Sequence, residues 1–122
     1  MEQNYDLVAR SAEVNAKSLG EEKVGTLDHS VLSLVAEQMM SGNEVVVAGQ
    51  RFRVTRTGTR RFRMVRFVME DGEYQAIEQN PEKPSRWGKL AREGRRVVQV
   101  RDVASGKYVG VVVDGKVTEY SR

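Results

Sequence analysis

The sequence contains no cysteine, only two prolines and a single histidine, and no long hydrophobic run. The absence of cysteine excludes disulfide bonds, thiolate catalysis and zinc sites built on cysteine. A helix that crosses a membrane needs about 20 consecutive apolar residues, and even the strongly apolar stretch at residues 109–113 is far shorter. We therefore expect no association with a membrane.

Residues that could carry catalysis are also scarce. His29 is expected in the first turn of a helix, where it is a surface or capping residue rather than a metal ligand. No histidines and carboxylates cluster at metal-ligand spacing, and the nucleophile elbow, the phosphate loop and the dinucleotide fingerprint are missing. We predict no catalytic residue, no metal site and no cofactor. The N-terminus lacks the pattern of a secretory signal, so a soluble, cytoplasmic protein is the default expectation.

The length of 122 residues corresponds to one domain, long enough to bury a core without disulfides or metals. Apolar residues recur at helical spacing over residues 28–41, and a second helix is predicted from about Pro84 or Ser85 to Glu93. Short alternating segments separated by glycine turns fill most of residues 44–120. The sequence predicts an α+β fold: a twisted, mostly antiparallel sheet of about seven short strands, open or half-closed into a barrel, with an N-terminal helix and one crossover helix.

The predicted domain spans residues 26–122. Residues 1–25 are acid-rich and show only a thin apolar stripe, which predicts either a flexible arm or a loosely docked helix. The apolar parity of the strand at residues 61–69 changes between Met64 and Val65, and this predicts a β-bulge or burial on both faces. The predicted core consists of Val31, Leu34, Val35, Val46, Phe52, Val54, Phe62, Met64, Phe67, Ile77, Trp87, Leu90, Val98, Val100, Val111 and Val113.

Charge is distributed unevenly along the chain. Residues 1–43 hold three Lys/Arg and seven Asp/Glu (3 − 7 = −4), whereas residues 44–122 hold seventeen and ten (17 − 10 = +7). Residues 51–66 contain seven arginines and no acid. Local fields of this kind indicate an anionic partner more directly than the net charge of +3 does.

A hairpin with a three-residue loop at residues 57–59 would place Arg53 opposite Arg63 and Val54 opposite Phe62. Like charges that face each other destabilise a sheet by up to about 1 kcal/mol, so they require compensation from carboxylates or from an anionic ligand. Guanidinium groups bind phosphate and carboxylate through paired donors. A second cationic element is expected at the helix that contains Arg86 and Lys89.

These features predict a non-catalytic binding module with an arginine-rich sheet face. Three interpretations remain open: a solvated face neutralised by surface acids, a nucleic-acid surface with Tyr74, Tyr108 or Trp87 as stacking aromatics, and a surface for an acidic protein. The acidic N-terminal arm is one such partner, and an alternative function is protein–protein interaction or homo-oligomerisation. The oligomeric state is not predicted. The candidate anion-binding residues are Arg51, Arg53, Arg56, Arg60, Arg61, Arg63, Arg66, Arg86 and Lys89.

A second alternative is a small enzyme with a site near Glu78, Asn80 and Arg86. These residues flank a connection that contains both prolines, and connections carry function more often than regular elements do. The competing interpretation is a rigid strand-to-helix connection in which Asn80 bonds to its own backbone. The enzyme hypothesis requires the three side chains to converge.

Overall fold

A computed structural model of the protein describes residues 25–57 and 62–121. The described part is an α+β domain with two helices and eight strands, which confirms the predicted fold class. The elements are α1 (His29–Ser41), β1 (Glu44–Val47), β2 (Gln50–Arg53), β3 (Thr55–Thr57), β4 (Phe62–Met69), β5 (Gly72–Glu78), α2 (Arg86–Arg92), β6 (Val97–Asp102), β7 (Tyr108–Val113) and β8 (Lys116–Tyr120).

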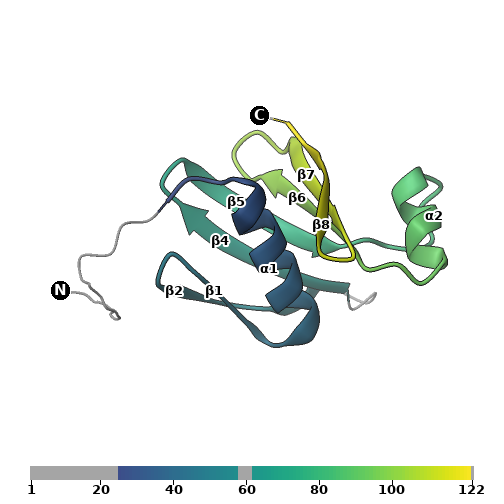
Figure 1. The fold of residues 1–122 in the computed structure, drawn as a ribbon, viewed down its shortest axis with the longest axis horizontal. Coiled ribbons are helices and arrows are strands. Elements are labelled where there is room, and N and C mark those ends of the chain that lie inside the picture. The colour runs from purple at the N-terminus through teal and green to yellow at the C-terminus, as the bar shows by residue number, and fades with distance from the viewer. Residues whose placement is uncertain (1–24, 58–61, 122) are drawn as a thin grey trace.

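The strands form two antiparallel sheets: β1 pairs with β2, and β3 to β8 pair in chain order. Helix α1 lies across one face of the main sheet and contacts both β1 and β8 (Figure 1). Because it touches the small sheet and the last strand of the large one, the two sheets enclose α1 without closing into a barrel. We call the face of the main sheet that packs on α1 the inner face and the opposite face the outer face.

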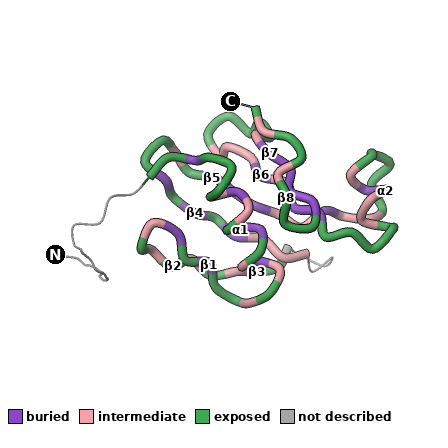
Figure 2. The backbone as a smooth tube through the Cα atoms, in the orientation of Figure 1, coloured by how far each residue is buried: buried purple, intermediate pink, exposed green. Residues whose placement is uncertain are grey.

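The inner face and α1 hold the main core. Asp28 caps α1, since its Oδ1 accepts a hydrogen bond from the N–H of Val31 at 2.9 Å. Buried positions follow the strands β4 to β7 and the middle of α1 (Figure 2). Leu32 of α1 packs so closely on β7 that a Cβ added to Gly110 would lie 2.9 Å from its Cδ1. The helix therefore approaches the sheet at a position without a side chain.

The predicted core is partly wrong at two elements. Leu34 is 43% exposed and Val46 is 37% exposed, whereas Val35, Phe67, Val98, Val100, Val111 and Val113 are buried as predicted. In α1 the buried stripe runs through Leu32, Val35, Ala36 and Met39, so Leu34 lies beside it. In β1 the alternate positions Val45 and Val47 face inward. A strand of valines offers two equivalent parities, and packing on α1 selects one of them.

The change of parity in β4 involves no bulge between β4 and β5. The register between these strands is unbroken from Met64 to Met69. Val65, Phe67 and Met69 are buried on the inner face, while Met64 is half-buried on the outer face. The second predicted option, burial on both faces, is the one that β4 adopts. Register shifts occur instead between β6 and β7 and between β7 and β8.

Helix α2 lies in the connection between β5 and β6, which pair directly, so it crosses no strand. Val97, Val111 and Val113 alternate with inner-face residues and therefore point to the outer face. There they pack with three residues of α2: Trp87, Leu90 and Ala91. Helix α2 lies beyond the ends of the strands (Figure 1), and its apolar residues pack against that end of the outer face.

The edge of β1 that faces away from β2 is covered by a side chain of α1. The Gln38 amide donates to the carbonyl of Val46 at 2.9 Å and accepts from its N–H at 3.0 Å. Both backbone groups of Val46 are thereby satisfied, as they would be by a neighbouring strand. Neither helix in the described residues is long and apolar enough to span a membrane.

Candidate functional site

The predicted pairing of the arginine hairpin is wrong. Arg56, not Arg53, lies opposite Arg63, and Thr57 lies opposite Phe62. The N–H of Val54 donates to the carbonyl of Asn43 at 2.9 Å, and at this residue the chain passes from the small sheet into the large one. Strand β2 therefore pairs with β1 and not with β4. Arg60 and Arg61 lie outside the described residues.

Arg63 stabilises the end of α1. Its Nη1 donates to the carbonyls of Met40 at 2.5 Å and Met39 at 3.3 Å, and its backbone N–H donates to Glu78 Oε1 at 3.0 Å. The last carbonyls of a helix have no partner within it, and a cation there also opposes the negative end of the helix dipole. Arg63 is thus an architectural residue on the inner side and does not belong to an open ligand surface.

Two further candidates lie on β2, away from the main sheet. The guanidinium of Arg51 forms an ion pair with Glu44 at 2.9 Å, with 71% and 54% of the two side chains exposed. Arg53 lies opposite Glu44 in the register and is exposed. Exposed pairs of this kind contribute about 0–1 kcal/mol. Arg56 is exposed on the neighbouring strand β3. These three arginines fit the interpretation of a solvated surface.

The outer face contains an arginine row that crosses three strands. Arg66, Gln75 and Arg101 are register partners on β4, β5 and β6. The Nε of Arg101 donates to the Gln75 amide at 2.8 Å, and Gln75 is only 7% exposed. Arg66 is 3.6 Å from Glu73, and more than half of its side chain is exposed. Gln75 thus orients Arg101 from below, while Arg66 stays accessible.

Helix α2 adds cations to the same side of the sheet. Arg86 stacks on the Trp87 ring at 4.1 Å and lies 3.4 Å from Glu119. Lys89 is exposed in the last turn of α2. Of the predicted candidates, Arg66 therefore lies on the outer face of β4, and Arg86 lies beside Glu119 of β8, with Lys89 exposed on the same helix.

The three aromatic residues predicted to stack on bases lie in different environments. Tyr74 is buried on the inner face and packs against Phe67 at a ring separation of 5.9 Å. Trp87 is half-buried beneath Arg86. Tyr108 is 56% exposed and is the register partner of Arg101. Sequence reasoning missed Arg101, because its alignment with Arg66 becomes visible only once residues 73–78 are paired with residues 97–102.

The residues of the enzyme hypothesis have separate local partners. Glu78 accepts from the backbone of Arg63, Arg86 interacts with Trp87 and Glu119, and the Asn80 side chain accepts from the N–H of Glu82 at 2.8 Å. The last bond is the local backbone contact expected for a rigid connection. Within the described residues, no group of three or more histidines or carboxylates is arranged to hold a metal ion.

The connection is further fixed to α2. Arg92 donates to the carbonyls of Pro81 at 2.6 Å and Lys83 at 3.0 Å. Ser85 caps the helix, with its Oγ accepting from the N–H of Gly88 at 3.1 Å. These bonds make residues 80–92 one local unit, in which the connection is held against α2.

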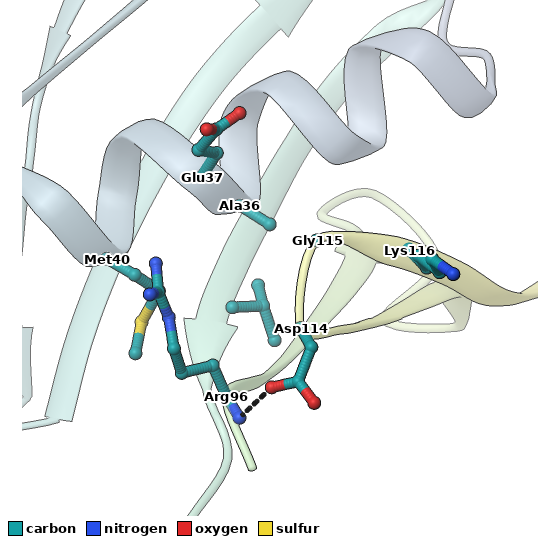
Figure 3. A pocket seen from close by; sticks show the side chains of 8 residues that line it. Ala36, Glu37, Met40, Arg96, Asp114, Gly115 and Lys116 are labelled. Carbon is teal, nitrogen blue, oxygen red and sulfur yellow. Dashed lines mark hydrogen bonds between the residues drawn. The ribbon is translucent and has the colours of Figure 1, made fainter.

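A hollow of about 460 Å³ opens between the C-terminal half of α1 and the turn that joins β7 to β8 (Figure 3). Asp114 lies in this turn, where its Oδ1 accepts from the backbone N–H of Arg96 at 2.9 Å and its Oδ2 pairs with the guanidinium of Arg95. The bond from Arg96 and the pair with Arg95 lower the pKa of Asp114 below its ordinary value of 3.8. The carboxylate therefore remains ionised at neutral pH and is occupied by its own chain.

A lowered pKa means that ionised Asp114 stabilises the folded state above the ordinary pKa, and that this contribution is lost as the pH falls through the lower folded-state pKa. We expect Asp114→Asn to lower the melting temperature at pH 7, and we expect the difference from wild type to shrink below pH 3.8. Thermal unfolding followed by circular dichroism between pH 7 and 2 measures this. A difference that is constant over the whole range would show that the carboxylate charge is irrelevant.

A second hollow of about 430 Å³ is lined by Asp71, Asp102, Tyr74 and Tyr108, among others. Its carboxylates accept local and tertiary hydrogen bonds. Asp102 binds the N–H and hydroxyl of Ser105, and Asp71 lies 3.4 Å from the N–H of Leu27. The two acids are therefore used to hold turns and chain segments together.

Comparison of the chain with protein-family models, with curated proteins and with solved structures gives no match.

Proposed function

We propose that the protein is a non-catalytic binding module that binds single-stranded nucleic acid on the outer face of its main sheet. The observation that carries the proposal is the arrangement of Arg66, Arg101 and Arg86 on one side of the sheet. Exposed Tyr108 is the register partner of Arg101, and a base can stack on such a ring. A nucleic-acid partner is consistent with the cytoplasmic location expected from the sequence.

Energetics favour exchange of the intramolecular ion pairs for phosphates. The contacts of Arg66 with Glu73 and of Arg86 with Glu119 are exposed, and such pairs contribute about 0–1 kcal/mol each. Displacing the glutamates therefore costs little, and release of the counterions condensed on the nucleic acid provides the gain. Arg101 needs no such exchange, because its bond with Gln75 uses only Nε.

The proposal is tested by fluorescence anisotropy with a labelled single-stranded oligonucleotide at 50 and 200 mM salt. Three phosphate contacts give a slope of about −2 in log affinity against log salt, so the affinity should fall about twentyfold. The variant Arg66→Gln/Arg101→Gln should bind more weakly and lower the slope to about −0.7.

The matched control is Arg51→Gln/Arg53→Gln, which removes the same charge from β2. It should leave both the affinity and the slope close to wild type. Equal weakening by the two double variants would show that only the overall charge matters. A lack of binding at 50 mM salt would exclude the nucleic-acid function.

A further inference from the structure

The hollow between α1 and the β7–β8 turn combines an apolar floor with unpaired charges. Val98 and Ala36 are only 1% and 4% exposed, and Met40 is half-buried beside them. The volume of about 460 Å³ falls within the range of about 300–1,000 Å³ that is usual for small-molecule sites. The hollow opens on the inner side of the sheet, so it is separate from the outer face proposed for nucleic acid.

Arg96 and Lys116 supply the positive charge of this hollow. Arg96 extends from its backbone bond with Asp114 toward Met40, and within the described part of the chain its guanidinium has no hydrogen bond or ion pair (Figure 3). The ammonium of Lys116 is likewise unpaired among these residues. Asp114 is also engaged by Arg95 and by the backbone N–H of Arg96, so its charge is shared with a third cation.

The negative charge at this end of α1 is small. Helix C-termini repel anions, but here Arg63 donates to the carbonyls of Met39 and Met40 from the other side. Glu37 is the remaining carboxylate of the hollow. The hollow is therefore lined by two cations and two carboxylates, of which Asp114 is paired with Arg95, next to a buried apolar surface.

From this arrangement we infer that the hollow binds a small organic anion that carries one carboxylate on an apolar body. The guanidinium of Arg96 binds the carboxylate, and the apolar body covers Met40, Ala36 and Val98. Lys116, at the opposite end of the hollow, adds to the electrostatic attraction of the anion (Figure 3). A guanidinium suits this task because its paired donors match the two oxygens of a carboxylate. A cationic ligand would meet the two cations, and a neutral one would leave both without a partner.

The test uses the full chain and the fluorescent anion 8-anilinonaphthalene-1-sulfonate, displaced by octanoate or, as an uncharged comparison, by 1-octanol. We expect octanoate to displace the dye and 1-octanol to be at least about tenfold weaker. Arg96→Gln should weaken octanoate binding about five- to tenfold, since it removes a charge-assisted contact at a partly exposed site. Glu37→Gln should strengthen it about twofold by removing a like charge.

Arg53→Gln and Lys89→Gln are the matched controls, because they remove an equal charge outside the hollow. Lys116→Gln provides a second test of the site and should weaken binding even if Arg96→Gln does not fold. Cooperative thermal unfolding of each variant ensures that the dye reports on a folded protein. The inference is overturned if octanoate and 1-octanol compete equally, or if the control variants weaken binding as much as Lys116→Gln and Arg96→Gln do.

Discussion

Replacement of Gly88 by alanine is expected to lower the free energy of unfolding by about 3 kcal/mol, the upper end of the usual cost of overpacking. A Cβ at this position would lie 2.1 Å from the carbonyl oxygen of Lys83 and 2.9 Å from its carbonyl carbon. Both are backbone atoms, and the bonds from Arg92 to Pro81 and Lys83 hold them against α2. The connection cannot move away without losing these bonds.

The sign of this result is informative, because helix propensity alone predicts the opposite. Alanine is more favourable than glycine inside a helix by about 1 kcal/mol. Urea unfolding monitored by circular dichroism measures the difference, and Lys89→Ala, at an exposed position of the same helix, is the control and should change stability by less than about 0.5 kcal/mol. A more stable Gly88→Ala variant would mean that residues 80–92 do not pack as described.

Replacement of Arg63 by methionine is expected to lower the free energy of unfolding by about 2 kcal/mol. The variant keeps most of the apolar stem but removes a guanidinium that donates to two carbonyls at the end of α1. Hydrogen bonds to charged groups contribute about 1.5–3 kcal/mol, and partly buried carbonyls would lose their donor. Urea unfolding at neutral pH provides the measurement.

Arg66→Met is the matched control for Arg63→Met on the same strand. Arg66 is exposed and only 3.6 Å from Glu73, so its replacement should cost less than about 1 kcal/mol. Together the two variants separate an arginine that supports the fold from an exposed arginine on the same strand. An equal loss in the free energy of unfolding for the two variants would contradict the role of Arg63 as a helix cap.

The arginine segment also shows what the sequence could and could not predict. Alternation and glycine turns correctly predicted antiparallel strands and the α+β class, because these signals are local. The pairing of Arg53 with Arg63 was wrong because it assumed a single hairpin strand, whereas the chain changes sheet at Val54. The sequence around Val54 does not show whether residues 50–57 form one strand or two. The change of sheet depends on a bond from the N–H of Val54 to the carbonyl of Asn43, which lies in the connection between α1 and β1.

The candidate site shows the same difference between local sequence signals and tertiary pairing. Arg66 and Arg86 were selected by their charge, and both lie on the outer side of the sheet. Arg63 was selected for the same reason, yet it supports α1. Arg101 was missed because its relation to Arg66 depends on two successive strand pairings. Composition thus selects candidate residues by their charge, while tertiary packing determines which of them are exposed on the same side of the sheet.

The contact between Gln38 and Val46 has a consequence for how this sheet can grow. Another chain that sought to extend the small sheet at β1 would find the donor and the acceptor of Val46 already occupied by the amide of Gln38. Many exposed edge strands are protected by charge or proline, whereas here the protection comes from a helix that also holds the core together. Growth of the sheet past Val46 therefore requires the Gln38 amide to give up both bonds, so protection of this edge depends on a side chain that α1 holds in place.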